Sequence, residues 1–227
     1  MPLMIRSPRL LAGFTLVELM VALVINALIF IFLLGIFSAN LTHYNQILNT
    51  NRLNQQLDAI MQIMATDIRR AGYWSQEYTE AGTNTNTNPF QNSGTGTDVA
   101  VGGVGNSCIT FSYDHNNTGT LPGISALADD DRYGYRLNGT NIQTRPWGAT
   151  FSCGAAAAAW ENMNNSTITI SALTFTLNTY TITTGPGAQG ITQRSVDIVL
   201  TGYITTAPTI TKTLTQHVRI NNDYFVP

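Results

Sequence analysis

The sequence is poor in charge and especially poor in lysine. Charged residues make up 11% of its 227 residues, the formal net charge is -2, and Lys212 is the only lysine beside ten arginines. The arginines are scattered along the chain and form no basic cluster. Proteins that bind nucleic acid neutralise phosphates with grouped Lys and Arg, so a strong electrostatic footprint for DNA or RNA is absent. We expect no nucleic-acid partner.

The residues that usually carry chemistry are few and widely separated. The chain has two cysteines and three histidines, and their spacing matches no metal-ligand pattern. No histidine stands in a recognisable arrangement with a serine or cysteine nucleophile. We therefore expect no enzyme, no cofactor and no resident metal. The residues concerned are Cys108, Cys153, His43, His115 and His217.

One long segment contains neither proline nor glycine. Between Leu41 and Arg70, apolar residues recur at steps of three or four, which is the spacing of one helix face. Polar side chains, Asp67 among them, fill the other positions. We predict an amphipathic helix here, with its apolar stripe packed under a β-sheet. The stripe consists of Leu53, Leu57, Ile60, Met64 and Ile68.

The preceding run contains no charge at all. Leu19 to Phe37 is 19 residues of apolar sequence broken only by Asn26. As a helix it would be roughly 28 Å long, close to the hydrocarbon thickness of a bilayer. Glu18 directly precedes this run. At the boundary of a membrane, a carboxylate costs free energy unless a cation pairs with it. We predict one helix from about Phe14 to Arg70, its first half in membrane or filament core.

The residues from Met1 to Glu18 resemble the class III signal of type IV pilins and secretion pseudopilins. The matching features are the short leader Met1–Gly13 with its two arginines, then Gly13, Phe14 and Glu18. The resemblance implies that a prepilin peptidase cuts between Gly13 and Phe14, that the Phe14 amine is N-methylated, and that this ammonium pairs with Glu18 of a neighbouring subunit. An ordinary membrane anchor would explain the apolar run but neither Glu18 nor the Gly–Phe junction. A Sec signal peptide has its apolar stretch before the cleavage site.

The end of the predicted helix carries a second resemblance. The string from Asp67 to Trp74, DIRRAGYW, is similar to the helix exit of PilW-type minor pilins. A generic capped helix end is the alternative, because Arg69 and Arg70 complement the helix dipole and Gly72 suits a left-handed cap.

Two further features depend on the export signal. An even number of cysteines in an exported chain favours a Cys108–Cys153 disulfide, closing a loop of about 45 residues, and two buried thiols are the alternative. Some pseudopilins bind calcium through loop carboxylates, which makes Asp129, Asp130 and Asp131 candidate ligands. Three adjacent acids cannot all face one ion, and the D-x-D-x-D-G spacing is absent, so we expect a solvated loop.

Strand patterns dominate the rest of the chain. We predict a hairpin across Asn138–Gly139, and an antiparallel meander of three long strands with a bulge near Ser171–Ala172. The predicted strands are residues 98–101, 108–113, 132–137, 140–144, 167–183, 194–205 and 209–221.

These elements predict an α+β, pilin-like fold in which a long N-terminal helix, hydrophobic and then amphipathic, packs on an antiparallel β-sheet head. The expected divisions are a cleaved leader (1–13), a hydrophobic transmembrane or filament-core helix (14–39), an amphipathic helix (40–72) and an extracytoplasmic β-rich head (73–227).

The resemblance implies a minor type IV pilin that primes pilus assembly in a tip complex. Its implied partners are other minor and major pilins, the prepilin peptidase and methylase, the inner-membrane assembly platform, and the membrane through residues 14–39. Its implied location is the inner membrane, with the head in the periplasm, and then the pilus at the cell surface. A J-type pseudopilin of type II secretion stays open, as does a tip adhesin or DNA-uptake subunit.

Overall fold

The computed structural model describes residues 13, 15–80, 87–92, 96–123, 130–154, 160–183 and 190–226. Contacts divide the chain into two compact units, Met1–Leu48 and Asn49–Pro227, and each is described by itself. Of the predicted leader only Gly13 is described, and Phe14 and Asp129 also lie outside the described residues.

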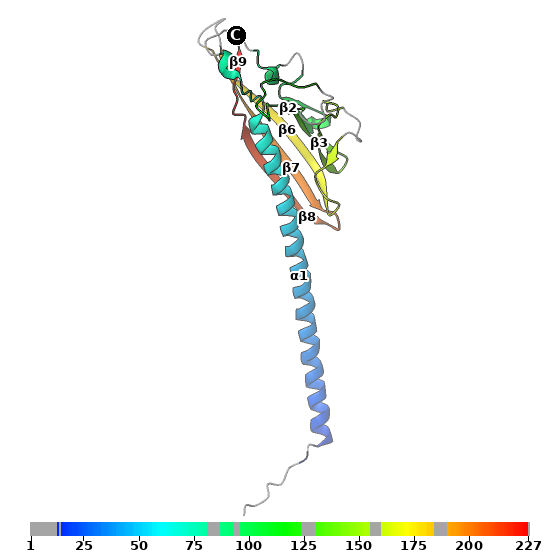
Figure 1. The fold of residues 1–227 in the computed structure, drawn as a ribbon. Coiled ribbons are helices and arrows are strands. Elements are labelled where there is room, and N and C mark those ends of the chain that lie inside the picture. The colour runs from blue at the N-terminus through cyan, green and yellow to red at the C-terminus, as the bar shows by residue number, and fades with distance from the viewer. Residues whose placement is uncertain are drawn as a thin grey trace, which may run out of the picture. The chain divides into compact units, whose positions relative to one another are not determined.

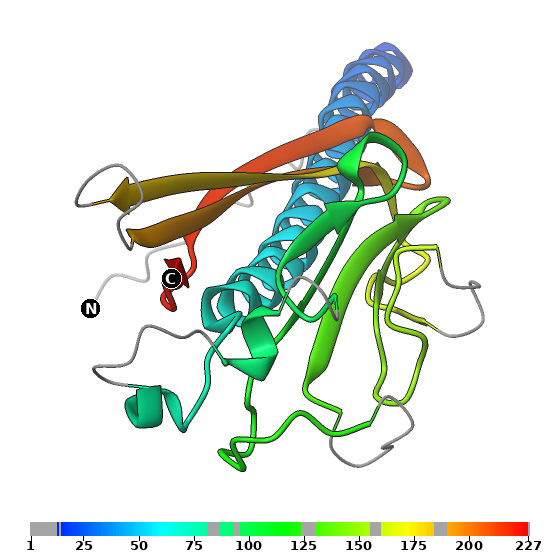
Figure 2. The same ribbon diagram turned by 90° about the horizontal axis from the view of Figure 1, so that it is seen from above.

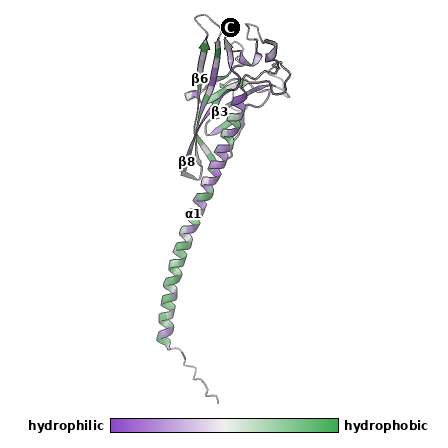
Figure 3. Cartoon of the chain, turned by 90° about the vertical axis from the view of Figure 1, so that its left-hand side faces the viewer, coloured by the Kyte–Doolittle hydropathy of each residue, from purple (hydrophilic) through white to green (hydrophobic). Residues whose placement is uncertain are grey.

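Helix α1 spans Leu16–Arg70 and confirms the predicted long helix (Figure 1). Within Met1–Leu48, its stretch from Leu19 to Phe37 is apolar apart from Asn26, and the large apolar side chains of this stretch are exposed (Figure 3). Among the described residues, α1 is the one helix long and apolar enough to cross a membrane. Apolar side chains exposed in such number require a bilayer or neighbouring helices to cover them.

The part of α1 within Asn49–Pro227 buries the predicted stripe. All five stripe residues are buried, together with two that the stripe did not include, Met61 and Ala65. They share one hydrophobic core with strand residues such as Ile109, Ile198 and Leu200. Tertiary burial of one face therefore stabilises this part of the helix, as the sequence predicted.

The helix ends at a glycine that no other residue could replace without strain. Gly72 adopts φ +74°, the left-handed conformation predicted for it. A Cβ at this position would lie 2.7 Å from the Gln91 side-chain nitrogen. The Gly72 N–H donates to the Ser112 carbonyl at 2.8 Å rather than to a helix carbonyl, so the cap also ties α1 to a strand.

Five strands form the first antiparallel sheet, in the order β1-β2-β3-β4-β5. Two predictions were wrong in detail. Asp98 lies before β1, because its carboxylate accepts from the Val99 N–H and pairs with Arg194. In the β3–β4 hairpin Asn138 pairs with Asn141, so the two loop residues are Gly139 and Thr140. The strands are β1 (Ala100–Gly102), β2 (Cys108–Ser112), β3 (Arg132–Asn138), β4 (Asn141–Thr144) and β5 (Glu161–Asn162), and β5 was not predicted.

The second sheet confirms the predicted meander, with strand order β6-β7-β8, and with β9 pairing β7 (Figures 1 and 2). The register shifts between Ile170 and Ala172, where the bulge was predicted. Inward-facing residues of β7, including Val196, Ile198 and Leu200, alternate with half-exposed ones and supply one wall of the core. The strands are β6 (Ile168–Thr183), β7 (Gly190–Ile204), β8 (Ala207–Arg219) and β9 (Tyr224–Val226), and β9 was not predicted.

Candidate assembly site and the head that supports it

A reciprocal capping box closes the start of α1. The Thr15 N–H and hydroxyl both donate to Glu18 Oε2 at 3.0 Å, and the Glu18 N–H donates to Thr15 Oγ1 at 3.2 Å. This T-x-x-E arrangement satisfies backbone donors that the first turn of a helix leaves open. Glu18 therefore caps the helix of its own chain. The sequence analysis did not predict this role, although the T-x-x-E spacing of Thr15 and Glu18 is typical of a capping box.

The capping box leaves one carboxylate oxygen available. Among the described residues no hydrogen bond reaches Glu18 Oε1, whereas Oε2 accepts two. Gly13 is exposed just before the helix. The structure thus has an exposed glycine at the predicted cleavage position and a held carboxylate with acceptor capacity for a cation.

At the other end of α1, the predicted DIRRAGYW string is built into the head. Asp67 is half-buried, and its carboxylate accepts hydrogen bonds from the Tyr135 and Tyr113 hydroxyls at 2.5 and 3.5 Å. Burial raises the pKa of Tyr135, and the nearby Asp67 charge raises it further. Asp67 therefore joins the helix to β3 and does not belong to a solvated polar face.

The turn after α1 is held by a carboxylate from a distant loop. Both oxygens of Asp114 are used: Ser75 N–H, Thr118 N–H and Gly119 N–H donate to them, each at 3.0 Å. The Trp74 indole N–H donates to the Gly119 carbonyl at 2.8 Å, and Trp74 is buried. The aromatic end of the string is thus a structural anchor between two loops.

The two described residues of the acidic cluster, Asp130 and Asp131, are buried and do not lie in the expected solvated loop. Asp130 is fully buried, and its carboxylate pairs with Arg132 at 2.8 Å and with Arg145, and accepts the Gly148 N–H at 2.8 Å. Asp131 is also buried and accepts the His115 N–H at 3.0 Å. Because two guanidinium groups occupy Asp130, a calcium ion would have to displace them. Among the described residues, no group of three His, Cys, Asp or Glu side chains is arranged to hold a metal ion.

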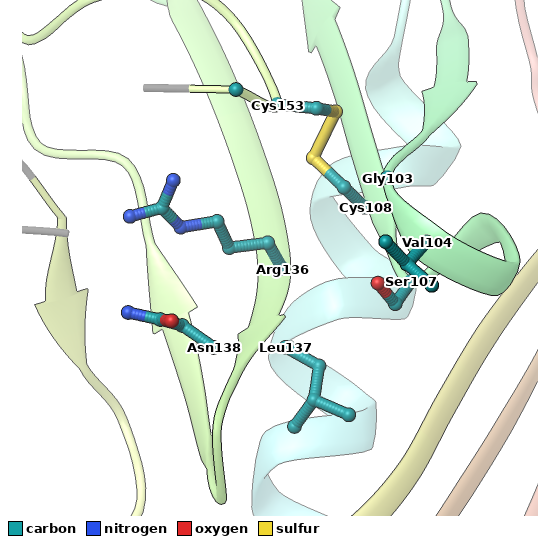
Figure 4. Close-up of a pocket in the computed structure, with 9 residues that line it drawn as sticks. Gly103, Val104, Ser107, Cys108, Arg136, Leu137, Asn138 and Cys153 are labelled. Carbon is teal, nitrogen blue, oxygen red and sulfur yellow. A yellow bond between two sulfur atoms is a disulfide. The ribbon is translucent and has the colours of Figure 1, made fainter. Parts of the chain in front are cut away.

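Cys108 and Cys153 form the predicted disulfide, with a Cα–Cα distance of 5.8 Å. The disulfide lines a pocket of about 570 Å³ between the turn before β2 and the end of β3 (Figure 4). Arg136 lies along the pocket wall, with its guanidinium 4.5 Å from the centre of the buried Trp160 ring and its Nε donating to Gln143. The bridge ties Cys153 to β2, and the stack ties Trp160 to β3.

The family model described as prepilin peptidase-dependent protein B matches residues 46–220. The chain belongs to this family. The match covers the amphipathic half of α1 and most of the head, and it does not include the Gly13–Glu18 signal. Two separate parts of the chain, the N-terminal signal and the head, therefore both indicate a pilin-like protein processed by prepilin peptidase. No curated protein and no solved structure matches the chain significantly.

For a prepilin peptidase-dependent protein, the structural features fall into two groups. Gly13, Thr15 and Glu18 lie at the start of an exposed apolar helix suited to membrane anchoring. The network at Asp67, the cluster at Asp130 and the disulfide stabilise the β head. The described head residues thus supply scaffold interactions, and the exposed apolar helix is suited to membrane anchoring.

Proposed function

We propose that the chain is a minor type IV pilin of PilW type, which primes pilus assembly in a tip complex with other minor pilins. Its function is assembly and not catalysis. Before assembly it sits as a single-pass protein in the inner membrane with its head in the periplasm, and afterwards in the pilus at the cell surface. Its partners are other minor and major pilins, the prepilin peptidase and methylase, and the inner-membrane assembly platform.

The observation that carries the proposal is a carboxylate held in the first turn of an exposed apolar helix. Glu18 is costly at a membrane boundary. The Thr15 donors offset part of that cost in the unassembled subunit, because they already bind Oε2. Cleavage after Gly13 then creates the Phe14 ammonium. In the filament, the ammonium of a neighbouring subunit reaches Oε1 and sets the axial register of two helices.

Two substitutions separate the pairing function of Glu18 from its capping function. Glu18→Gln keeps a side chain that suits a capping box but removes the charge. Glu18→Val removes both. If pairing drives assembly, both variants are cleaved and inserted, yet both enter the pilus poorly in sheared-pilus immunoblots. Normal incorporation of Glu18→Gln would contradict the pairing mechanism, because only the cap would then matter.

Processing is tested separately. Gly13→Leu should leave the precursor uncleaved, because a larger side chain replaces the residue before the cut. The measurement is a blot that resolves the 13-residue difference between precursor and mature chain. A mature band of normal abundance would refute the predicted junction. Deletion of the gene, scored for surface pili and for protein secretion, separates a minor pilin from a J-type pseudopilin.

A further inference from the structure

The second sheet has a polar face that is turned away from the core. Side chains alternate along β7, so Val196 and Ile198 face the core while the residues between and beside them face outward. Directly paired residues on β6 and β8 lie on the same side of the sheet as their β7 partners. The register therefore groups the outward-facing residues in three rows, which are Tyr180–Gln193, Asn178–Ser195–Arg219 and Thr176–Asp197–His217.

A depression of about 230 Å³ lies over these rows, and side chains from all three rows line it. Among the described residues, no side-chain hydrogen bond reaches the Ser195 hydroxyl or the Gln193 amide. In the same part of the chain Arg219 forms one ion pair, with Asp223 at 3.6 Å. Hydroxyl and amide groups both donate and accept hydrogen bonds. A ligand that matches this lining must therefore donate and accept at several neighbouring atoms.

Asp197 holds two of the lining side chains in place. Its Oδ1 lies 2.6 Å from His217 Nδ1, and its Oδ2 accepts the Asn178 side-chain N–H at 2.7 Å. Because a carboxylate only accepts, Nδ1 carries the proton and Nε2 of the neutral ring is an acceptor. The side chains of His217 and Asp197 are 64% and 41% exposed, and exposed pairs contribute little to stability. The main effect of this network is therefore to orient polar groups toward solvent.

One aromatic ring lies at the end of the polar rows. Tyr180 is 67% exposed, and its β7 partner is Gln193. A tyrosine presents an apolar ring face together with a polar hydroxyl. The depression thus combines a flat apolar surface at one end with convergent hydrogen-bonding groups beside it.

The charges and polarity of this face narrow the class of ligand. Asp197 and Asp223 lie beside the depression and oppose the charge of Arg219, and His217 adds a charge only when it is protonated, so neither a strong anion nor a strong cation is favoured. The cores of protein–protein interfaces are apolar and depleted in charge, which does not fit a lining with one aromatic ring among polar groups. A neutral ligand with many hydroxyl groups fits it better.

We propose that this depression binds a neutral sugar ring, a hexose unit of a glycan. Each sugar hydroxyl both donates and accepts, which matches Asn178, Gln193 and Ser195, and the apolar C–H face of the ring lies on Tyr180. Asp197 is a positioning residue, because it acts through His217 and Asn178. The inference is independent of the proposed assembly function, and normal pilus entry by Glu18→Gln would count against that function alone.

Saturation-transfer-difference NMR on the full-length chain tests the proposal. The chain is held in a detergent without a sugar headgroup, and the probes are the methyl glycosides of glucose, galactose, mannose and N-acetylglucosamine. We expect transfer to at least one of these sugars when protein aromatic protons are irradiated, with the largest signals from the C–H groups of one ring face. Absence of transfer to every one of them would overturn the proposal. Tighter binding of methyl glucuronide or inorganic phosphate than of any neutral sugar would overturn it as well.

Substitutions at exposed positions show whether binding occurs at this depression. Tyr180→Ala should weaken the affinity for the bound sugar by about tenfold or more, because the ring face is lost. The matched control is Tyr78→Ala, which removes a tyrosine that is 76% exposed elsewhere in the head and should leave the affinity unchanged. Unaltered tryptophan fluorescence checks that both variants are folded. Full affinity in Tyr180→Ala, or an equal loss in Tyr78→Ala, would refute the site.

A second pair of variants tests the positioning role of Asp197. Asp197→Asn should weaken sugar binding and also change the NMR titration of His217, because the carboxylate partner of Nδ1 is lost. Asp58→Asn, which removes an exposed carboxylate on α1, is the matched control and should change neither. Sugar affinity that is unchanged in Asp197→Asn, with an altered His217 titration, would contradict the positioning role.

Discussion

Asp130→Asn should destabilise the head more than any other single charge removal considered for this chain. The substitution keeps the volume of the side chain but removes the negative charge that Arg132 and Arg145 share. The side chains of these arginines are 9% and 0% exposed, so water cannot replace the lost partner. Removing one member of a buried ion pair costs about 3–5 kcal/mol, because the remaining charge stays buried.

Thermal unfolding followed by tryptophan fluorescence measures this effect, since all three tryptophans lie between residues 74 and 160 of the head. A change of about 1 kcal/mol in the free energy of unfolding shifts Tm by about 2–4 °C in a domain of this size. The expected decrease in Tm is therefore roughly 6–20 °C. The matched control is Asp197→Asn, which breaks an exposed pair with His217 and costs at most about 1 kcal/mol. Equally small shifts in both variants would refute the argument that burial makes the Asp130 network important.

Three further outcomes follow from other parts of the head. Paired replacement of Cys108 and Cys153 by serine should reduce the free energy of unfolding by about 2–4 kcal/mol, measured by urea titration; an unchanged midpoint would contradict this. Gly72→Ala should cost about 1–2 kcal/mol from the left-handed φ alone, and a stability equal to wild type would show that the cap relaxes freely. Hydrogen bonds from His217 and then from an asparagine lower the pKa of Asp197 below its ordinary 3.8, so its stabilising contribution is present above that value and is lost as pH falls through the folded-state pKa. NMR titration of His217→Ala should show the pKa of Asp197 rising, and an unchanged value would exclude His217 as the main cause.

The helix and the meander were predictable because their signals are local and repeated. The stripe from Leu53 to Ile68 repeats over several turns, and the alternation in β7 continues along most of the strand, so single exceptions do not hide the pattern. The β3–β4 turn was misplaced by one residue because Asn138–Gly139 is a strong hairpin signal. Register depends instead on cross-strand pairing, which places Asn138 opposite Asn141.

The interior of the head was less accessible to sequence reasoning. Three adjacent aspartates suggest a solvated loop, and the burial of Asp130 depends on Arg145, which is 15 residues away and directly follows β4. Likewise, Asp67 occupies a polar position of the helix, and only the fold shows that Tyr135 lies opposite it. The Thr15–Glu18 cap, in contrast, is a local motif. It was missed because Glu18 was interpreted only through its contact with a neighbouring subunit.

The last turn of α1 is completed by a segment more than 150 positions later in the chain. The Asn221 N–H donates to the Arg69 carbonyl at 3.0 Å, and the Asn222 side chain donates to the Arg70 and Ala71 carbonyls at 3.2 Å. These carbonyls therefore gain these partners only once residues 221 and 222 have folded against the end of α1. The end of the long helix thus depends on the C-terminal segment, so removal of residues 221–226 should loosen the last turn of α1 even though the helix itself is left intact in sequence.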